Sequence, residues 1–159
     1  SSAGGHLAAL IGTTNGNKEL EGTLGDFLTT SSDVQATIDL YGPTNFTTIL
    51  SQSTPHGISV RAPALALLLG KPVEQVPDLA KLASPVYQVD PTDPPIFIAH
   101  GEQDIQVPIN QSLELVGACE ANHVKVQFEV VYGAGHGTQE YNKPEFTDKM
   151  VAFLKEVLQ

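Results

Sequence analysis

The stretch Pro95-Ile96-Phe97-Ile98-Ala99-His100-Gly101-Glu102-Gln103-Asp104 decides the fold class of this 159-residue chain. Its continuous apolar run, Ile96 to Ala99, is typical of a strand that is covered on both faces of a parallel sheet. The polar, glycine-containing segment that follows marks the end of the strand. The pattern predicts a central buried strand, with Asp104 on the loop at its carboxyl end.

Two further strands are predicted, one on each side of this strand in the sequence. Apolar side chains alternate over residues 34–40, and Tyr41-Gly42-Pro43 ends that pattern. Over residues 124–130, apolar side chains alternate with Lys125, Gln127 and Glu129. The third strand should therefore have one wetter face and lie near an edge of the sheet.

Helical spacing occupies the gaps between the strands. It begins at Ala3 and ends in the breaker-rich residues 12–16, and it returns after the second and third strands. The residues that carry the two later helices are Ile109, Leu113, Val116, Phe146, Met150, Phe153 and Val157. Alternating strands and helices predict an α/β domain of three parallel strands with flanking helices.

The connection between the first two strands, residues 43–94, is too long for a simple crossover. It is rich in proline, and short helices fit around residues 43–51, 62–69 and 76–82. We therefore expect a helical cap insertion at about 43–94 within a single domain that covers residues 1–159.

Composition narrows the possible partners. Eight Lys and Arg residues against 18 Asp and Glu give a formal net charge of −10, so a nucleic acid would be repelled. No apolar run approaches the roughly 20 residues needed to cross a bilayer, so no membrane span is expected. Cys119 is the single cysteine, and its helical surroundings favour a buried, inert thiol.

Reactive side chains follow the strands at the edge where an open parallel sheet binds ligands. Asp104 follows the second strand, and His136 follows the third within Gly133-Ala134-Gly135-His136-Gly137. The chain opens Ser1-Ser2-Ala3-Gly4-Gly5 and runs into a helix, as does the second half of a G-x-S-x-G nucleophile elbow. The order Ser2, Asp104, His136 predicts a nucleophile, an acid and a base, and no Cys/His spacing indicates a metal site.

With these motifs the sequence resembles the α/β hydrolase superfamily, within it the esterases that carry Ser-Ala-Gly-Gly-His-Leu at the elbow. The likeness is to bacterial feruloyl and acetylxylan esterases, through residues 2–10, 38–46, 68–85, 95–112 and 132–137. It implies that Ser2 is the nucleophile, Asp104 the acid and His136 the base, and that the backbone N–H of Ala3 contributes to the oxyanion hole. It implies no metal or organic cofactor.

The resemblance begins at the elbow, so we expect this chain to be the carboxyl-terminal half of such a hydrolase. The sheet of the family has about eight strands, and the three predicted here would be its sixth to eighth. The glycine-rich loop with the family's other oxyanion donors would then belong to a missing amino-terminal half, along with any signal peptide. The compartment, secreted or cytoplasmic, is left open.

The function expected from this resemblance is a serine carboxylic ester hydrolase that acts through an acyl-enzyme on cell-wall or small acyl esters. Two alternatives stay open at this stage. One is a serine peptidase similar to prolyl oligopeptidase, whose closing motifs look alike. The other is a half-domain that is inactive alone and works only with its missing amino-terminal part.

Individual residues also have alternative interpretations. Residues 1–5 fit a flexible linker, Asp104 fits a helix-capping carboxylate, and Asp39 is a rival acid at the end of the first strand. For His136 the alternative interpretation is a solvated loop histidine, which its glycine neighbours disfavour. The other histidines are expected to be structural (His6 and His100) or exposed at the surface (His56 and His123), and the leucines Leu65, Leu67, Leu68 and Leu69 to pack in the core or line an acyl pocket.

Overall fold

The computed structural model describes residues 1–159 and contains one three-stranded parallel sheet. Its strands are β1 (Thr37–Leu40), β2 (Ile96–Gly101) and β3 (Val126–Val131), in the order β1-β2-β3. β2 pairs in parallel with both neighbours, and Ile96 lies opposite Thr37 of β1 and Val126 of β3. The predicted α/β class, with the 96–101 strand in the centre, is confirmed.

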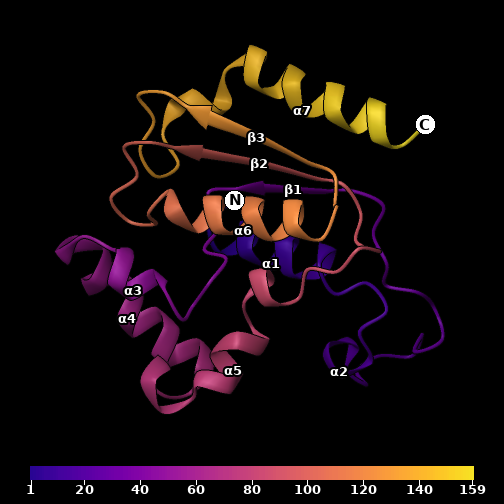
Figure 1. Cartoon of the computed structure of the whole chain (residues 1–159), viewed down its shortest axis with the longest axis horizontal. Helices are drawn as coiled ribbons and strands as arrows, with labels where there is room; N and C mark the ends of the chain where they lie inside the picture. The colour runs from indigo at the N-terminus through magenta and orange to yellow at the C-terminus, as the bar shows by residue number, and fades with distance from the viewer.

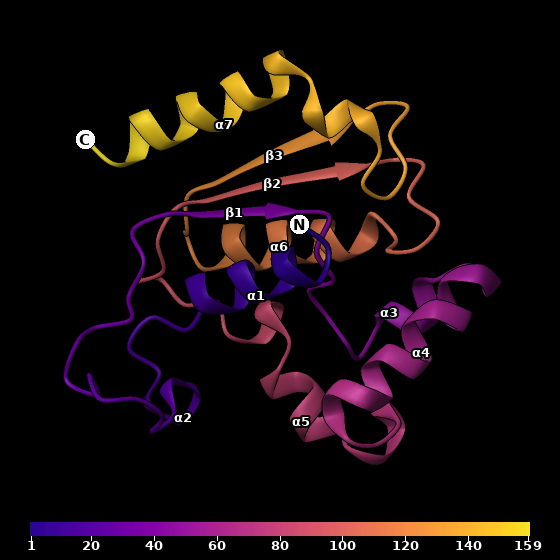
Figure 2. The same cartoon turned by 180° about the vertical axis from the view of Figure 1, so that it is seen from behind.

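Helices cover both faces of the sheet (Figures 1 and 2). On one face lie α1 (Ala3–Gly12) and α6 (Asn110–Ala121), and on the other lies α7 (Pro144–Val157). Alternate residues of β2 enter the two cores, because successive side chains of a strand point to opposite faces. Ile96 and Ile98 pack with α1 and α6, whereas Phe97 and Ala99 pack with α7. All four are fully buried, and burial of each large side chain stabilises the folded state by about 1.5–3 kcal/mol.

The expected wetter face of β3 is only partly observed. β3 lies at the edge of the sheet, as predicted, but every residue along it is half-buried. Its polar face lies against α7, where Lys149 forms an ion pair with Glu129. The helix thus covers the face that the alternating pattern indicated as solvent-facing.

The first strand is shorter than predicted, because it starts at Thr37 rather than at residue 34. The side-chain amide of Asn15 bonds both the N–H and the carbonyl of Val34 (3.1 and 2.9 Å), which ties residue 34 to the loop after α1. That loop contains one short helix, α2 (Lys18–Glu21), which the sequence analysis did not predict.

The segment between β1 and β2 is helical, as expected, but its helices have different limits. The elements are α3 (Ile49–Gln52), α4 (Pro55–Leu69), η1 (Val73–Gln75), α5 (Pro77–Leu82) and η2 (Pro85–Tyr87). The prediction that the middle helix starts at residue 62 is wrong. Thr54 caps α4 through the N–H of Gly57, Pro55 occupies its first turn, and Pro63 is tolerated inside it. One further short element, η3 (Gln139–Asn142), precedes α7.

Buried polar contacts attach this helical segment to the sheet domain. Gln111 of α6 is fully buried, and its side-chain oxygen accepts the N–H groups of Thr44 and Asn45. Its amide nitrogen donates to Thr48 and Gln52. These bonds fix the start of the segment close to the carboxyl end of β1. No helix of the structure has the length and apolar character needed to span a bilayer.

Candidate active site

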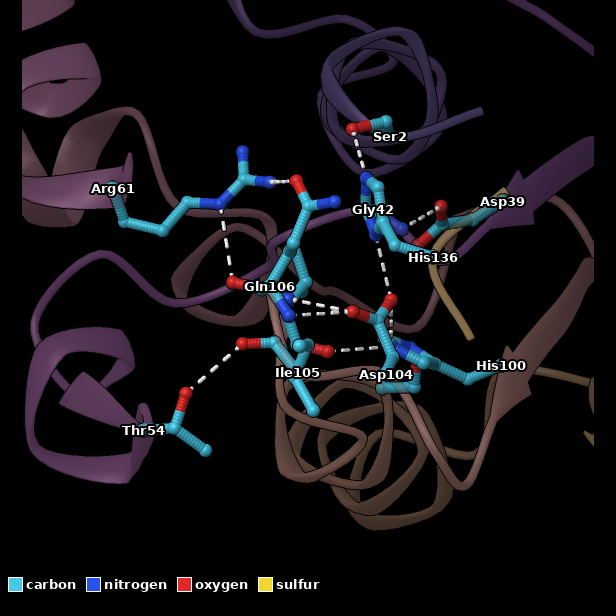
Figure 3. Close-up of polar contacts among 12 residues, drawn as sticks. Ser2, Asp39, Gly42, Thr54, Arg61, His100, Asp104, Ile105, Gln106 and His136 are labelled. Carbon is cyan, nitrogen blue, oxygen red and sulfur yellow. Dashed lines mark hydrogen bonds and ion pairs between the residues drawn. The ribbon is translucent and has the colours of Figure 1, made fainter. Parts of the chain in front are cut away.

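Three side chains from distant parts of the sequence form one hydrogen-bonded chain (Figure 3). Ser2 Oγ lies 2.8 Å from His136 Nε2, and His136 Nδ1 lies 2.6 Å from Asp104 Oδ2. The three residues lie at the start of α1, after β3 and after β2, at the carboxyl edge of the sheet. The expected convergence of these side chains is therefore observed. Asp104, which the capping interpretation assigned to a helix start, points at the histidine.

Ser2 stands on a sharp turn with an unusual backbone conformation. Its φ of 51° and ψ of −123° place it in a region that non-glycine residues rarely occupy, and its N–H donates to Leu40 O (2.9 Å). Gly5 lets this turn approach β1 closely, because a Cβ there would lie 2.3 Å from Asp39 Oδ1. Residues 3–5 are the first turn of α1, so the linker interpretation is wrong.

Ala3 is the first residue of α1, so its N–H has no acceptor within the helix. The helix dipole adds partial positive charge at this end. The position next to Ser2 therefore suits a developing negative charge on oxygen.

Asp104 is buried and surrounded by hydrogen-bond donors. Its Oδ1 accepts the N–H groups of Gln106 (2.8 Å) and Val107 (2.9 Å), while Oδ2 faces both His136 and His100. Burial by itself would raise the pKa of Asp104, but the hydrogen bonds from His100, His136 and these backbone groups outweigh it. The net result is a pKa below the usual range, which keeps the carboxylate ionised.

The hydrogen-bond partners define the tautomers of both histidines. His100 Nε2 lies 2.9 Å from the carbonyl of Val107, which can only accept, so Nε2 carries the proton and also points at Asp104 Oδ2 (3.4 Å). His100 Nδ1 then accepts from Ser112 Oγ (2.6 Å). By the same reasoning His136 donates from Nδ1 to the carboxylate, which leaves Nε2 as acceptor for the Ser2 hydroxyl.

The ring of His136 is held by aromatic packing. Tyr41 meets it edge-on with 5.0 Å between ring centroids, and Tyr41 itself packs on Tyr141 at 4.5 Å. Gly137 lies beside the Tyr41 ring with φ +66°. These contacts hold the ring in place, so the interpretation of His136 as a solvated loop histidine is wrong.

Asp39, the rival acid, does not contact His136. It is fully buried at the end of β1, where Oδ1 accepts the N–H of Gly42 (2.9 Å) and Oδ2 has no partner. Burial raises the pKa of Asp39 to about 6, although the Gly42 bond and the nearby His100 oppose this. Asp104, not Asp39, is thus the carboxylate in line with the histidine.

A cavity of about 200 Å³ opens beside Ala3, the residue after Ser2, between α1 and α4. Its lining is mostly apolar and consists of Ala3, His6, Pro43, Phe46, Ile49, Arg61, Ala64, Leu65 and Leu68. Leu65 also belongs to the core under α4, Leu69 lies in that core alone, and Leu67 points to solvent. Core packing is confirmed for Leu65 and Leu69, and Leu65 and Leu68 also line the cavity.

The remaining histidines lie as expected. His6 is buried, donates from Nε2 to Ala83 O (2.8 Å) and stacks on Phe46 at 4.7 Å. Burial lowers the pKa of His6, with the Ala83 bond acting in the opposite direction. His56 and His123 are exposed. Cys119 is buried, as predicted, and no cluster of side chains suited to a metal ion is found.

Arg61 and Gln106 stand next to the site and were not predicted from the sequence. Arg61 of α4 lines the cavity and bonds Gln106, which lies two residues after Asp104. Burial lowers the pKa of Arg61, and the charge of Asp104 counteracts this. One sequence signal could have found it, since Arg61 is the single arginine of a strongly acidic chain.

Comparisons with known proteins agree with this geometry. The model of the BD-FAE family matches residues 1–118. A truncated carbohydrate esterase from gut microbiota is 36% identical, with a TM-score of 0.85 over 98% of this chain and 56% of that chain. A bifunctional GH43-CE protein of Bacteroides eggerthii is 32% identical, with a TM-score of 0.87 over 99% of this chain and 21% of that chain.

Among curated proteins, esterase LipC of Mycobacterium tuberculosis is 29% identical over 137 residues, which are 86% of this chain and 33% of LipC. The chain thus spans about half of the gut esterase and a third of LipC. The match to the family model covers most of the chain, and the similar esterase structures share its fold. The chain belongs to the BD-FAE esterase family, within the α/β hydrolase fold.

Proposed function

We propose that this chain carries the catalytic triad of a serine carboxylic ester hydrolase that acts on acyl esters of cell-wall carbohydrates. The observation that carries the proposal is the unbroken chain of hydrogen bonds from Ser2 through His136 to Asp104. A serine hydroxyl needs a base within about 2.6–3.2 Å, and the Ser2–His136 distance of 2.8 Å meets this requirement.

In the proposed reaction, Ser2 Oγ attacks the ester carbonyl while His136 Nε2 accepts the hydroxyl proton. Asp104 stabilises the imidazolium and does not take the proton. His136 then gives that proton to the alcohol as it leaves, and an acyl-enzyme remains on Ser2. Water, deprotonated by His136, attacks the acyl carbonyl, and collapse of this second intermediate releases the carboxylic acid and regenerates Ser2.

The oxyanion would be stabilised in part by the N–H of Ala3. This assignment is supported by the place of Ala3 at the start of α1, where the N–H has no helical acceptor. Removing one donor of an oxyanion hole typically lowers kcat by about 10²–10³. A second donor would come from another part of the hydrolase fold.

We further propose that the chain works together with the amino-terminal half of that fold. Two observations support this partner. β1 is an unpaired edge strand, and Leu7 and Ile11 on α1 are about half exposed (55% and 49%). A parallel strand and helix placed there would pair the edge and cover the apolar side chains.

The substrate class rests on the relatives and on the cavity. The gut protein is described as a carbohydrate esterase, and the Bacteroides eggerthii protein as a bifunctional GH43-CE. The apolar cavity beside Ala3 suits the apolar part of an acyl ester. Feruloyl and acetyl esters of xylan are therefore the first substrates to test.

The direct test is covalent labelling of the intact protein with a fluorophosphonate probe, followed by mass mapping. We expect the label on Ser2, no label in Ser2→Ala, and full labelling in the matched control Ser59→Ala, which alters an exposed hydroxyl on α4. A properly folded intact protein without label on Ser2 would contradict the proposal. If only the isolated chain fails to label, the chain needs its amino-terminal partner.

A substrate panel separates esterase from peptidase. We expect turnover of p-nitrophenyl acetate, methyl ferulate or acetylated xylan, and none of a proline-containing amide. Amide cleavage without ester preference would assign the protein to the serine peptidases instead.

A further inference from the structure

A polar pair, Arg61 and Gln106, lies close to Asp104 (Figure 3), and Arg61 also lines the cavity. Arg61 Nε donates to the backbone carbonyl of Gln106 (3.2 Å), and Arg61 Nη2 donates to its side-chain oxygen (3.4 Å). The pair therefore connects α4 to the loop that carries Asp104.

These contacts determine which way the Gln106 amide faces. A guanidinium group only donates hydrogen bonds, so the amide oxygen must face Arg61 and the amide nitrogen must face away from it. In Figure 3 that nitrogen lies on the side of Ser2 and His136. It makes no hydrogen bond within the chain, and neither does Arg61 Nη1. Gln106 thus has unused amide N–H groups on the side that Ser2 and His136 occupy in Figure 3.

Gln106 is tied to the triad by a further contact, and Arg61 lies on the cavity next to it. The N–H of Gln106 donates to Asp104 Oδ1 (2.8 Å), and Arg61 lines the same cavity as Ala3. Both side chains are partly exposed, so a bound molecule can reach them.

We propose that Gln106 binds the hydroxyl groups of the sugar from which the acyl group is removed, and that Arg61 is a positioning residue that orients the Gln106 amide. This inference rests on the proposed function. His136 must pass its proton to the leaving alcohol, so the alcohol binds close to His136 and to the neighbouring loop that carries Gln106. The amide N–H groups of Gln106 suit sugar hydroxyls, whereas the cavity lining suits apolar groups.

The test compares two acetates in the intact protein, one with a hydroxylated alcohol and one without. The readout is the ratio of kcat/KM for a monoacetylated methyl xyloside to that for p-nitrophenyl acetate. In Gln106→Met, which has a similar shape but no N–H, we expect the ratio to fall about tenfold. Gln106→Glu keeps the oxygen that Arg61 binds but has no donor. The second carboxylate oxygen of Glu can still accept from a sugar hydroxyl, so the ratio should fall less than in Gln106→Met. A purely structural role would affect both acetates alike and leave the ratio unchanged in both variants.

Arg61 is tested through its coupling to Gln106. Arg61→Met should lower the ratio, and the double variant with Gln106→Met should be no lower than the Gln106 variant alone, because both changes act on one amide. Gln103→Leu is the matched control. Its side chain is exposed on the same loop and makes no hydrogen bond, so the ratio should stay within about twofold of wild type.

The outcomes separate this inference from the proposed function. If the wild-type protein hydrolyses neither acetate, the proposed function is wrong. If it hydrolyses both and the ratio is unchanged in Gln106→Met, the function stands and the assignment of Gln106 is overturned. Additive effects of Arg61 and Gln106 would overturn the positioning role of Arg61.

Discussion

Replacing Asp39 by asparagine should stabilise the protein above pH 6 and have little effect in acid. The Asp39 carboxylate is fully buried with one oxygen unpartnered, and burial raises its pKa from 3.8 to about 6. Asparagine keeps the oxygen that accepts the N–H of Gly42 and removes the buried charge. The substitution therefore isolates the cost of ionising Asp39.

The sign follows from proton linkage. Between pH 3.8 and 6 the native state holds the proton of Asp39 more tightly than the unfolded state, so wild-type stability falls as pH rises through this window. The full difference, 6 − 3.8 = 2.2 pK units at about 1.36 kcal/mol each, is about 3 kcal/mol. About 2 kcal/mol of it develops between pH 4.5 and pH 7.5.

Urea unfolding of wild type and Asp39→Asn at these two pH values measures the effect. The variant should gain about 2 kcal/mol more over wild type at pH 7.5 than at pH 4.5. The control Asp26→Asn removes the same charge from an exposed loop position and should show no such pH dependence. An advantage of Asp39→Asn that is equal at both pH values would refute the reasoning.

Three further predictions follow from individual contacts. Gly5→Ala should lower the free energy of unfolding by about 1–3 kcal/mol in urea titrations, because its Cβ would lie 2.3 Å from Asp39 Oδ1. The control Gly4→Ala has open space around its Cβ and should not be destabilised, so equal stability of the two variants would disprove this prediction. Asp104→Asn should lower kcat for p-nitrophenyl acetate by about 10³–10⁴ while the fold by circular dichroism is unchanged, because an amide favours the wrong tautomer of the triad histidine; a loss below tenfold would contradict it. Cys119 should not react with Ellman's reagent at pH 8 until urea is added, because burial, with the neighbouring acidic groups, raises its pKa to about 12, and rapid modification of the native protein would be inconsistent with this.

Much of the fold could be predicted because local pattern and tertiary environment agree in the sheet. The apolar run from Ile96 to Ala99 predicts a strand buried on both faces, and helices cover it on both. Parallel strands bring their carboxyl ends to one edge, so the positions of Ser2, Asp104 and His136 after their predicted elements were enough to place them together.

Predictions were less accurate where neighbours outside the local window decide the structure. Thr54 and Pro55 start α4 seven residues before the predicted position at residue 62, because a cap and a first-turn proline outweigh the single internal Pro63. The polar face of β3 is half-buried because α7 lies over it.

The sequence by itself determined the sheet class, the order of its strands along the chain and the candidate side chains that follow the strands. These properties follow from the periodicity of apolar residues and from the types of residue that follow each strand. Only the tertiary structure decided that Asp104 rather than Asp39 meets His136, and that Arg61 binds the side-chain oxygen of Gln106. Both contacts join side chains that are more than 30 residues apart in the sequence and depend on distances of a few ångströms. A local sequence pattern cannot predict such distances.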